Sequence, residues 1–296
     1  MLLAVAAALA SAACFAAGSA VQHRAASAAA EGESGLALIR RLIHRPSWLF
    51  GLLLSAIAFA LHAFALSQGD LALVQPVIVS GVVFAVLFRA GLEHKWPPRR
   101  VLVWLPITWA GLALFLAVRP DEADASPLST RAIWFVSLTV VLVIAARLLA
   151  QRTTIDRRRG LLLGGGAGAL FGLVAGLAKM VLDQLAGGGF SSIFEHWPLY
   201  ALVVTGTWAV LMNQRAYQVS RLSVSAPILN IVQVFTAVGF GVTVFGEEFG
   251  STLGVFVGEF IGLVVVVLGV YRLASRPAED EEPAGSAREP DRSTAA

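Results

Sequence analysis

The stretch 216–248, AYQVSRLSVSAPILNIVQVFTAVGFGVTVFGEE, is the most patterned part of an apolar chain. It is typical of a helix end, a short basic turn and a long apolar helix with Pro227 near its start. A shorter version occurs earlier at 65–88, ALSQGDLALVQPVIVSGVVFAVLF. When Pro76 is set on Pro227, the pattern A-x5-L-x4-P occurs in both stretches. The sequence therefore predicts two copies of one helical hairpin.

The composition indicates a membrane protein in contact with a lipid bilayer. The 296 residues are 57% hydrophobic and only 14% charged, whereas soluble domains carry about 25% charged residues. The single cysteine, Cys14, excludes a disulfide framework and a Cys-based metal site. No basic patch with interleaved aromatic residues indicates a nucleic-acid partner. Without H-E-x-x-H, G-x-S-x-G or a Cys/His cluster, we expect neither an enzyme nor a cofactor.

Apolar stretches near the ~20 residues that a spanning helix needs occur along the whole chain. We expect one all-α bundle with nine transmembrane helices, at about 2–21, 48–67, 71–89, 101–118, 131–149, 160–182, 197–213, 223–245 and 252–271. The first lacks a basic segment before it, so we interpret it as a retained helix and not a signal peptide.

Loop charges predict the orientation. Basic residues gather after the first, third, fifth, seventh and ninth helices, as in Arg157, Arg158 and Arg159, and acidic residues gather in the other loops. Because basic loops stay in the cytoplasm, we expect the N-terminus outside, the C-terminus inside and an inner-membrane location.

Two segments are expected outside the bilayer core. One is an amphipathic surface helix with apolar residues at helical spacing, Leu36, Ile39, Leu42 and Ile43. The other is the tail 273–296, whose Pro, Glu and small polar residues predict a disordered cytoplasmic end.

The two hairpins are five helices apart, an odd number, so the copies run in opposite directions across the membrane. This predicts an inverted 4+1+4 layout with repeat one at 1–118, a connector helix at 131–149 and repeat two at 160–272. Inverted repeats are a transporter architecture. The alternative is a chance match of two proline-containing helices.

The segments AFALSQGDLALVQPV (63–77), QRAYQVSRLSVSAPIL (214–229) and FGEEFGSTLGVFVGEFIGLVVVVLGV (245–270) resemble the drug/metabolite transporter superfamily, in particular its EamA-like group. That group usually has ten helices. A nine-helix layout with the N-terminus outside is more similar to the NIPA-type magnesium transporters of the same superfamily, and Trp48-x-x-Gly51 resembles that branch too. The chain departs from the branch at Phe59, where an acidic residue is usual.

Pro76 and Pro227 each remove a helix hydrogen bond and free a carbonyl one turn earlier. They would bend helices that line a central cavity, or they are packing kinks. Asn230 and Gln233 share a helix face with Pro227. The first copy has fewer polar residues at the corresponding place, among them Gln75. Such amides could bond a polar solute or hold helices together.

Glu259 lies deep in the last helix, so it could carry a coupling proton, pair with a cation or make a structural bond. Lys179 could be its partner or could extend to the membrane surface. His62 lies at mid-membrane and is either a packing histidine or a proton relay. Two glycine runs at intervals of four are expected to be packing faces, namely Gly164, Gly168, Gly172 and Gly176, and Gly254, Gly258 and Gly262.

The resemblance implies a secondary transporter that moves a small metabolite or drug-like solute by alternating access. The substrate-path candidates are Gln75, Pro76, Pro227, Asn230, Gln233, Glu259, His62 and Lys179, and no metal site is expected. One alternative is a magnesium or other divalent-cation transporter, and another is a scaffold that transports nothing. A homodimer, the coupling ion, the substrate and the direction of transport stay open.

Overall fold

The computed structural model describes residues 1–27, 44–93, 97, 99–118, 130–219, 222–247 and 252–274. The expected surface helix at 36–43 and the tail beyond residue 274 lie outside the described residues. The described part is helical and contains no strand. The all-α prediction is confirmed for that part of the chain.

The helices match the predicted spans closely. They are α1 (Leu2–Ser27), α3 (Pro46–Gln68), α4 (Leu71–Val79), α5 (Val82–Glu93), α6 (Arg99–Val118), α7 (Thr130–Arg152), α8 (Asp156–Glu195), α9 (Trp197–Val219), α10 (Leu222–Phe240), the π-helix η1 (Gly241–Phe245) and α11 (Leu253–Ala274). With α4 and α5 taken as one span, eight in the described residues are long and apolar enough to cross a membrane. The remaining expected span, 197–213 in α9, falls outside that set.

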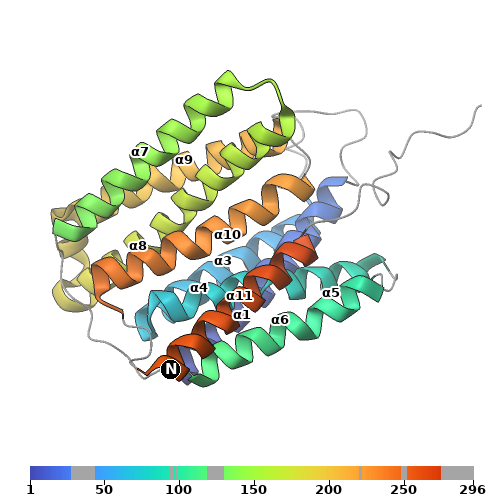
Figure 1. Ribbon diagram of the computed structural model, residues 1–296, viewed down its shortest axis with the longest axis horizontal. Helices are drawn as coiled ribbons and strands as arrows, with labels where there is room; N and C mark the ends of the chain where they lie inside the picture. The colour runs from blue at the N-terminus through green and yellow to red at the C-terminus, as the bar shows by residue number, and fades with distance from the viewer. Residues whose placement is uncertain are drawn as a thin grey trace, which may run out of the picture.

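The helices form one bundle in which α7, α8 and α9 make one side and α1, α5, α6 and α11 the other (Figure 1). On the first side α8 packs against α7, α9 and α10. On the other, α1 packs against α3, α4 and α5, and α6 packs against α11. The two sides meet where α4 contacts α10 and α3 contacts α8.

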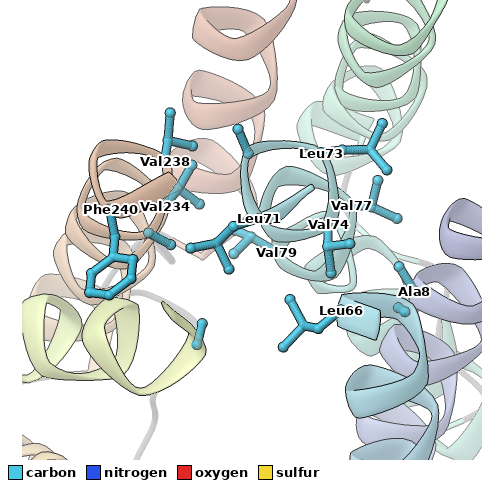
Figure 2. Close-up of a cluster of buried hydrophobic side chains, with 14 of the residues drawn as sticks. Ala8, Leu66, Leu71, Leu73, Val74, Val77, Val79, Val234, Val238 and Phe240 are labelled. Atoms are coloured by element: carbon cyan, nitrogen blue, oxygen red, sulfur yellow. The ribbon is translucent and has the colours of Figure 1, made fainter. Parts of the chain in front are cut away.

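The short helix α4 lies at the centre of the bundle, with every residue except Ile78 buried. Figure 2 shows Val234 and Val238 of α10 on one side of α4, and Leu66 of α3 on another. Residues on all faces of α4 are thus removed from lipid and water. A polar side chain on this helix must find its partners inside the protein or in a bound solute.

The predicted helix 71–89 is interrupted after Val79, three residues after Pro76. The Gly81 amide donates to the carbonyl of Ile78, 3.0 Å away, which tightens the backbone into a turn. A Cβ at Gly81 would lie 2.9 Å from the Cβ of Ala12. The interruption therefore lies where α1 approaches closely, and this contact cannot be predicted from the local sequence.

The glycine run on α8 is confirmed as a packing face against α10. A Cβ at Gly164 would lie 2.8 Å from the carbonyl oxygen of Ser225, and one at Gly172 would lie 2.7 Å from that of Gln233. Backbones this close leave no room for a side chain. On α11 the pattern is only partly in contact, because Gly262 meets Gly111 and Phe115 of α6, whereas Gly254 has no neighbour within 4 Å.

Helix α8 covers 40 residues in two parts, and its first part, 156–188, is about 50 Å long at the usual rise. It bends at Gly189, whose φ of 72° lies in the left-handed region that favours glycine. After the bend, Phe190 and Phe194 are exposed, and their rings meet edge to face at 5.4 Å between centroids. Tyr200 of α9 donates to the carbonyl of Phe194, so this end of α8 is fixed to the start of α9.

We expect Gly168→Ala to destabilise the folded bundle by about 1–3 kcal/mol, a typical cost of overpacking a close contact. The new Cβ would collide with the carbonyl oxygen of Leu229. Gly165→Ala is the matched control, because its Cβ would lie 3.8 Å from Ile228 and Val232, an ordinary contact. Both changes gain the same helix propensity, so thermal unfolding in detergent isolates the packing difference. Equal melting temperatures for the two variants would contradict the close approach of α8 and α10.

Candidate functional site

The interior of the bundle is apolar apart from a small number of polar and charged side chains. Four of these decide what the interior can bind, because each is almost fully buried: Gln75, Lys179, Glu247 and Glu259. Such groups are expensive in a membrane unless they are bonded or serve a ligand.

Glu247 holds the beginning of α4. Its carboxylate oxygens accept hydrogen bonds from the amides of Leu71 at 2.6 Å and of Ala72 at 2.7 Å. These are amides of the first turn, which have no partner within the helix. The negative charge also lies at the positive end of the helix dipole. Gly246, with φ of 70°, ends η1 and lets the chain turn so that Glu247 reaches α4.

Lys179 of α8 holds the end of α3. Its ammonium donates to the carbonyls of Leu66 at 3.1 Å and of Gly69 at 2.9 Å, and it lies 5.5 Å from the ring centre of Phe245. Two expectations for Lys179 were wrong: it does not pair with Glu259, and it does not extend to the surface, since it is 7% exposed. The carbonyls at the end of α3 replace both partners, because they carry the negative end of the helix dipole.

Gln75 and His62 come together between α4 and α3. The Gln75 amide nitrogen lies 3.4 Å from Nε2 of His62. The Gln75 side chain is fully buried, and its carbonyl oxygen has no hydrogen-bond partner among the described residues. Turning the amide over would exchange its oxygen and nitrogen, but one of the two would still lack a partner. The pair therefore offers an unused hydrogen-bonding group in the centre of the bundle.

Among the described residues, no hydrogen bond joins the remaining candidates to this pair. Pro76 follows Gln75 in α4 and is buried, and Pro227 is buried near the start of α10. Asn230 and Gln233 are half-buried on α10, and neither side chain bonds another described residue. The start of α4 lies beside the end of η1, where Glu247 binds it. Pro227 lies roughly 27 Å of helix before that end, so the two prolines lie near opposite ends of the bundle.

Glu259 is fully buried on α11, beside Gly258 and one turn before Gly262, both of which pack against α6. In the described part of the chain, no group of three or more His, Cys, Asp or Glu side chains could hold a metal ion. Besides the Gln75–His62 pair, the described interior therefore holds two almost fully buried carboxyls, Glu247 and Glu259, and one buried ammonium, Lys179.

Sequence reasoning missed the role of Glu247, which it placed only at a helix end. A signal was present, because an acidic residue follows Gly246 at the end of one apolar helix, while Asp70 and Leu71 begin another. The amides that Glu247 binds are 175 and 176 positions away. Almost every residue has a backbone amide, so the sequence does not indicate which amides Glu247 binds.

The chain is 28% identical over 290 residues to an uncharacterized protein of Corynebacterium glutamicum, covering 97% of this chain and 99% of that protein. It is 23% identical over 255 residues to the probable magnesium transporter NIPA9 of Arabidopsis thaliana, covering 81% of this chain and 72% of that protein. No protein-family model and no solved structure matches. The chain is therefore a multi-pass helical membrane protein with weak similarity to a transporter.

We expect Gln75→Met to change the stability of the bundle by less than about 1 kcal/mol. Methionine has a similar unbranched shape; it removes a buried carbonyl that has no partner, which is favourable, and the 3.4 Å contact with His62, which is unfavourable. Chemical unfolding in detergent measures the difference. The control is Gln214→Met on the exposed face of α9, which should change stability by less than about 0.5 kcal/mol. A clear loss of stability in Gln75→Met alone would mean that the amide is fully bonded within the fold.

Proposed function

We propose that the chain is a secondary transporter of a small polar metabolite or drug-like solute, working by alternating access in the inner membrane. The observation that carries this proposal is the Gln75–His62 pair, an unused hydrogen-bonding group on the most deeply buried helix. A group of this kind costs free energy in the fold unless a ligand bonds it. Function, rather than stability, explains its presence.

The packing pattern supports the inverted repeat that alternating access needs. If α1, α3, α4–α5 and α6 correspond to α8, α9, α10–η1 and α11, the pair α1–α3 corresponds to α8–α9, and α1–α4 corresponds to α8–α10. The pairs α4–α10 and α6–α11 join each helix to its own counterpart, as a twofold axis in the membrane plane requires. On this proposal α7 is the connector.

A solute path beside α4 and α10 fits the same layout. Gln75 and His62 would contact the solute, and the half-buried amides of Asn230 and Gln233 extend the polar surface along α10. Lys179 and Glu247 are excluded from direct solute contact in this conformation, because helix ends occupy them. Pro76 and Pro227 would allow their helices to flex near opposite ends.

Magnesium is the second candidate substrate. The similarity to the probable magnesium transporter over 81% of the chain favours it. Mg²⁺ keeps several waters and needs only one or two carboxylates, so Glu259 could serve it. The position where the magnesium branch has an acidic residue is Phe59 here, and its side chain is 66% exposed on α3. A carboxylate at that position would face lipid.

We expect purified protein in liposomes to move a polar solute from a pool of metabolites, with a rate that falls about tenfold or more in Gln75→Met. Losing one hydrogen bond to a buried polar group removes that much binding. His62→Ala should lower the rate as well. Gln214→Met is the control and should transport like the parent.

The same liposomes separate the alternatives. Magnesium uptake that disappears in Glu259→Gln and persists in Gln75→Met would replace the metabolite proposal by the cation transporter. No flux of any solute, with the protein folded, would favour the scaffold. Proton movement that accompanies solute uptake would identify the coupling ion.

The orientation has its own test. A reporter fused after Leu273 should be found on the cytoplasmic side, because the basic loops place the C-terminal end of α11 inside. A second fusion within the loop 153–155, next to Arg157, should report the same side. A reporter after Leu273 found outside the cell would contradict the orientation and the order of the repeats.

A further inference from the structure

The turn at 68–70 between α3 and α4 joins the two helices that carry His62 and Gln75. Both of its helix ends are held by charged side chains from the second half of the chain. Lys179 comes from α8 and binds the end of α3, while Glu247 follows η1 and binds the start of α4. The four bonds span 110 to 176 positions of sequence, so they link the two halves of the molecule at one end.

In both contacts, the charge of the side chain is opposite to the partial charge of the helix end that it binds. The cation lies on carbonyls at a helix C-terminus, and the carboxylate lies on amides at a helix N-terminus, so each charge meets the opposite end of a helix dipole. Both partners are backbone groups that would otherwise lack a bond inside the protein. At 2% exposure for Glu247 and 7% for Lys179, water cannot replace the bonds while this end stays packed.

Gly241 gives independent evidence that the structure makes room for the Glu247 carboxylate. A Cβ at Gly241 would collide with the Glu247 carboxylate. The Gly241 carbonyl also accepts from the amides of Gly246 and Glu247, the latter at 3.2 Å. The wide π-turn of η1 and the glycine at its start therefore leave just enough room for the carboxylate to lie against α4.

Alternating access requires the two repeats to separate at one end while they close at the other. We propose that Glu247 and Lys179 are positioning residues that keep this end closed, and that breaking their bonds with the α3–α4 turn opens the Gln75–His62 pair to that side. The proposal rests on the transport function proposed above. It assigns the two buried charges to control of access and not to solute binding.

The test measures access directly and needs no substrate. The reporter is Leu71→Cys in a Cys14→Ser background; Leu71 is fully buried and points toward α10 (Figure 2). The rate of labelling by a charged maleimide is measured in lipid nanodiscs, where both membrane faces are open to the reagent. We expect Glu247→Gln to raise this rate by about tenfold or more, because it replaces two charge-assisted bonds by one neutral bond.

Three further variants separate the proposal from a general loss of structure. Gly241→Ala should raise the Leu71→Cys rate while keeping the carboxylate, because it displaces Glu247 from α4. Lys179→Met should raise it by releasing α3. Glu195→Gln, at the exposed end of α8, should leave it unchanged. A second reporter, Leu273→Cys, lies buried at the far end of α11 in a cluster with Val83 and Leu105, and it should stay protected in every variant.

The outcomes are distinct. Faster labelling at Leu71→Cys with protection at Leu273→Cys supports the proposal, even if the liposomes reveal no transported solute. Unchanged labelling at Leu71→Cys in Glu247→Gln and Gly241→Ala would overturn it. Faster labelling at both reporters would also overturn it, because the two charges would then support the whole fold. Loss of transport in Gln75→Met with unchanged labelling tests the solute path separately.

Discussion

The bond between the Glu247 carboxylate and the first amides of α4 is the contact on which the arrangement of the interior depends. Helix α4 is too short to span a bilayer, and it begins inside the protein, where its first amides cannot reach bulk water. A carboxylate from the other half of the chain satisfies them. With Lys179 at the end of α3, it provides partners for backbone groups on both sides of the turn at 68–70, which would be costly to leave free inside the protein.

This arrangement divides the buried polar residues into two kinds. Lys179 and Glu247 are charged and are bonded to helix ends, so they shape the bundle without offering anything to a solute. Gln75 is neutral, lies on the same central helix and keeps one polar atom without a partner. Glu259, fully buried on α11, belongs to neither kind. On the transport function proposed above, Gln75 would bond a polar, uncharged part of the solute.

The sequence predicted the positions of the helices well, but it did not predict which residues of different helices contact each other. Apolar length and glycine spacing predicted the spans and the α8 packing face, because both depend on local composition. The interruption after Val79 depends on Ala12 of α1, which lies far away in sequence. Lys179 was misplaced because its acceptors are backbone carbonyls 110 and 113 positions away, and a carbonyl is present at every residue. Gln75 and His62 were named as candidates because amide and imidazole side chains stand out among apolar neighbours, but their contact with each other was not predicted.

The length of α8 limits how the bundle can lie in its membrane. The part of α8 before Gly189, residues 156–188, is about 50 Å long at the usual rise, which exceeds the ~30 Å hydrocarbon core. At least one end of it therefore extends past the core. With the Gly189 end outside, the exposed rings of Phe190 and Phe194 would lie at the level of the lipid headgroups, where aromatic side chains are favoured. Because Phe194 is bonded to Tyr200 of α9, these rings would then mark a depth to which a membrane of a different thickness has to adapt.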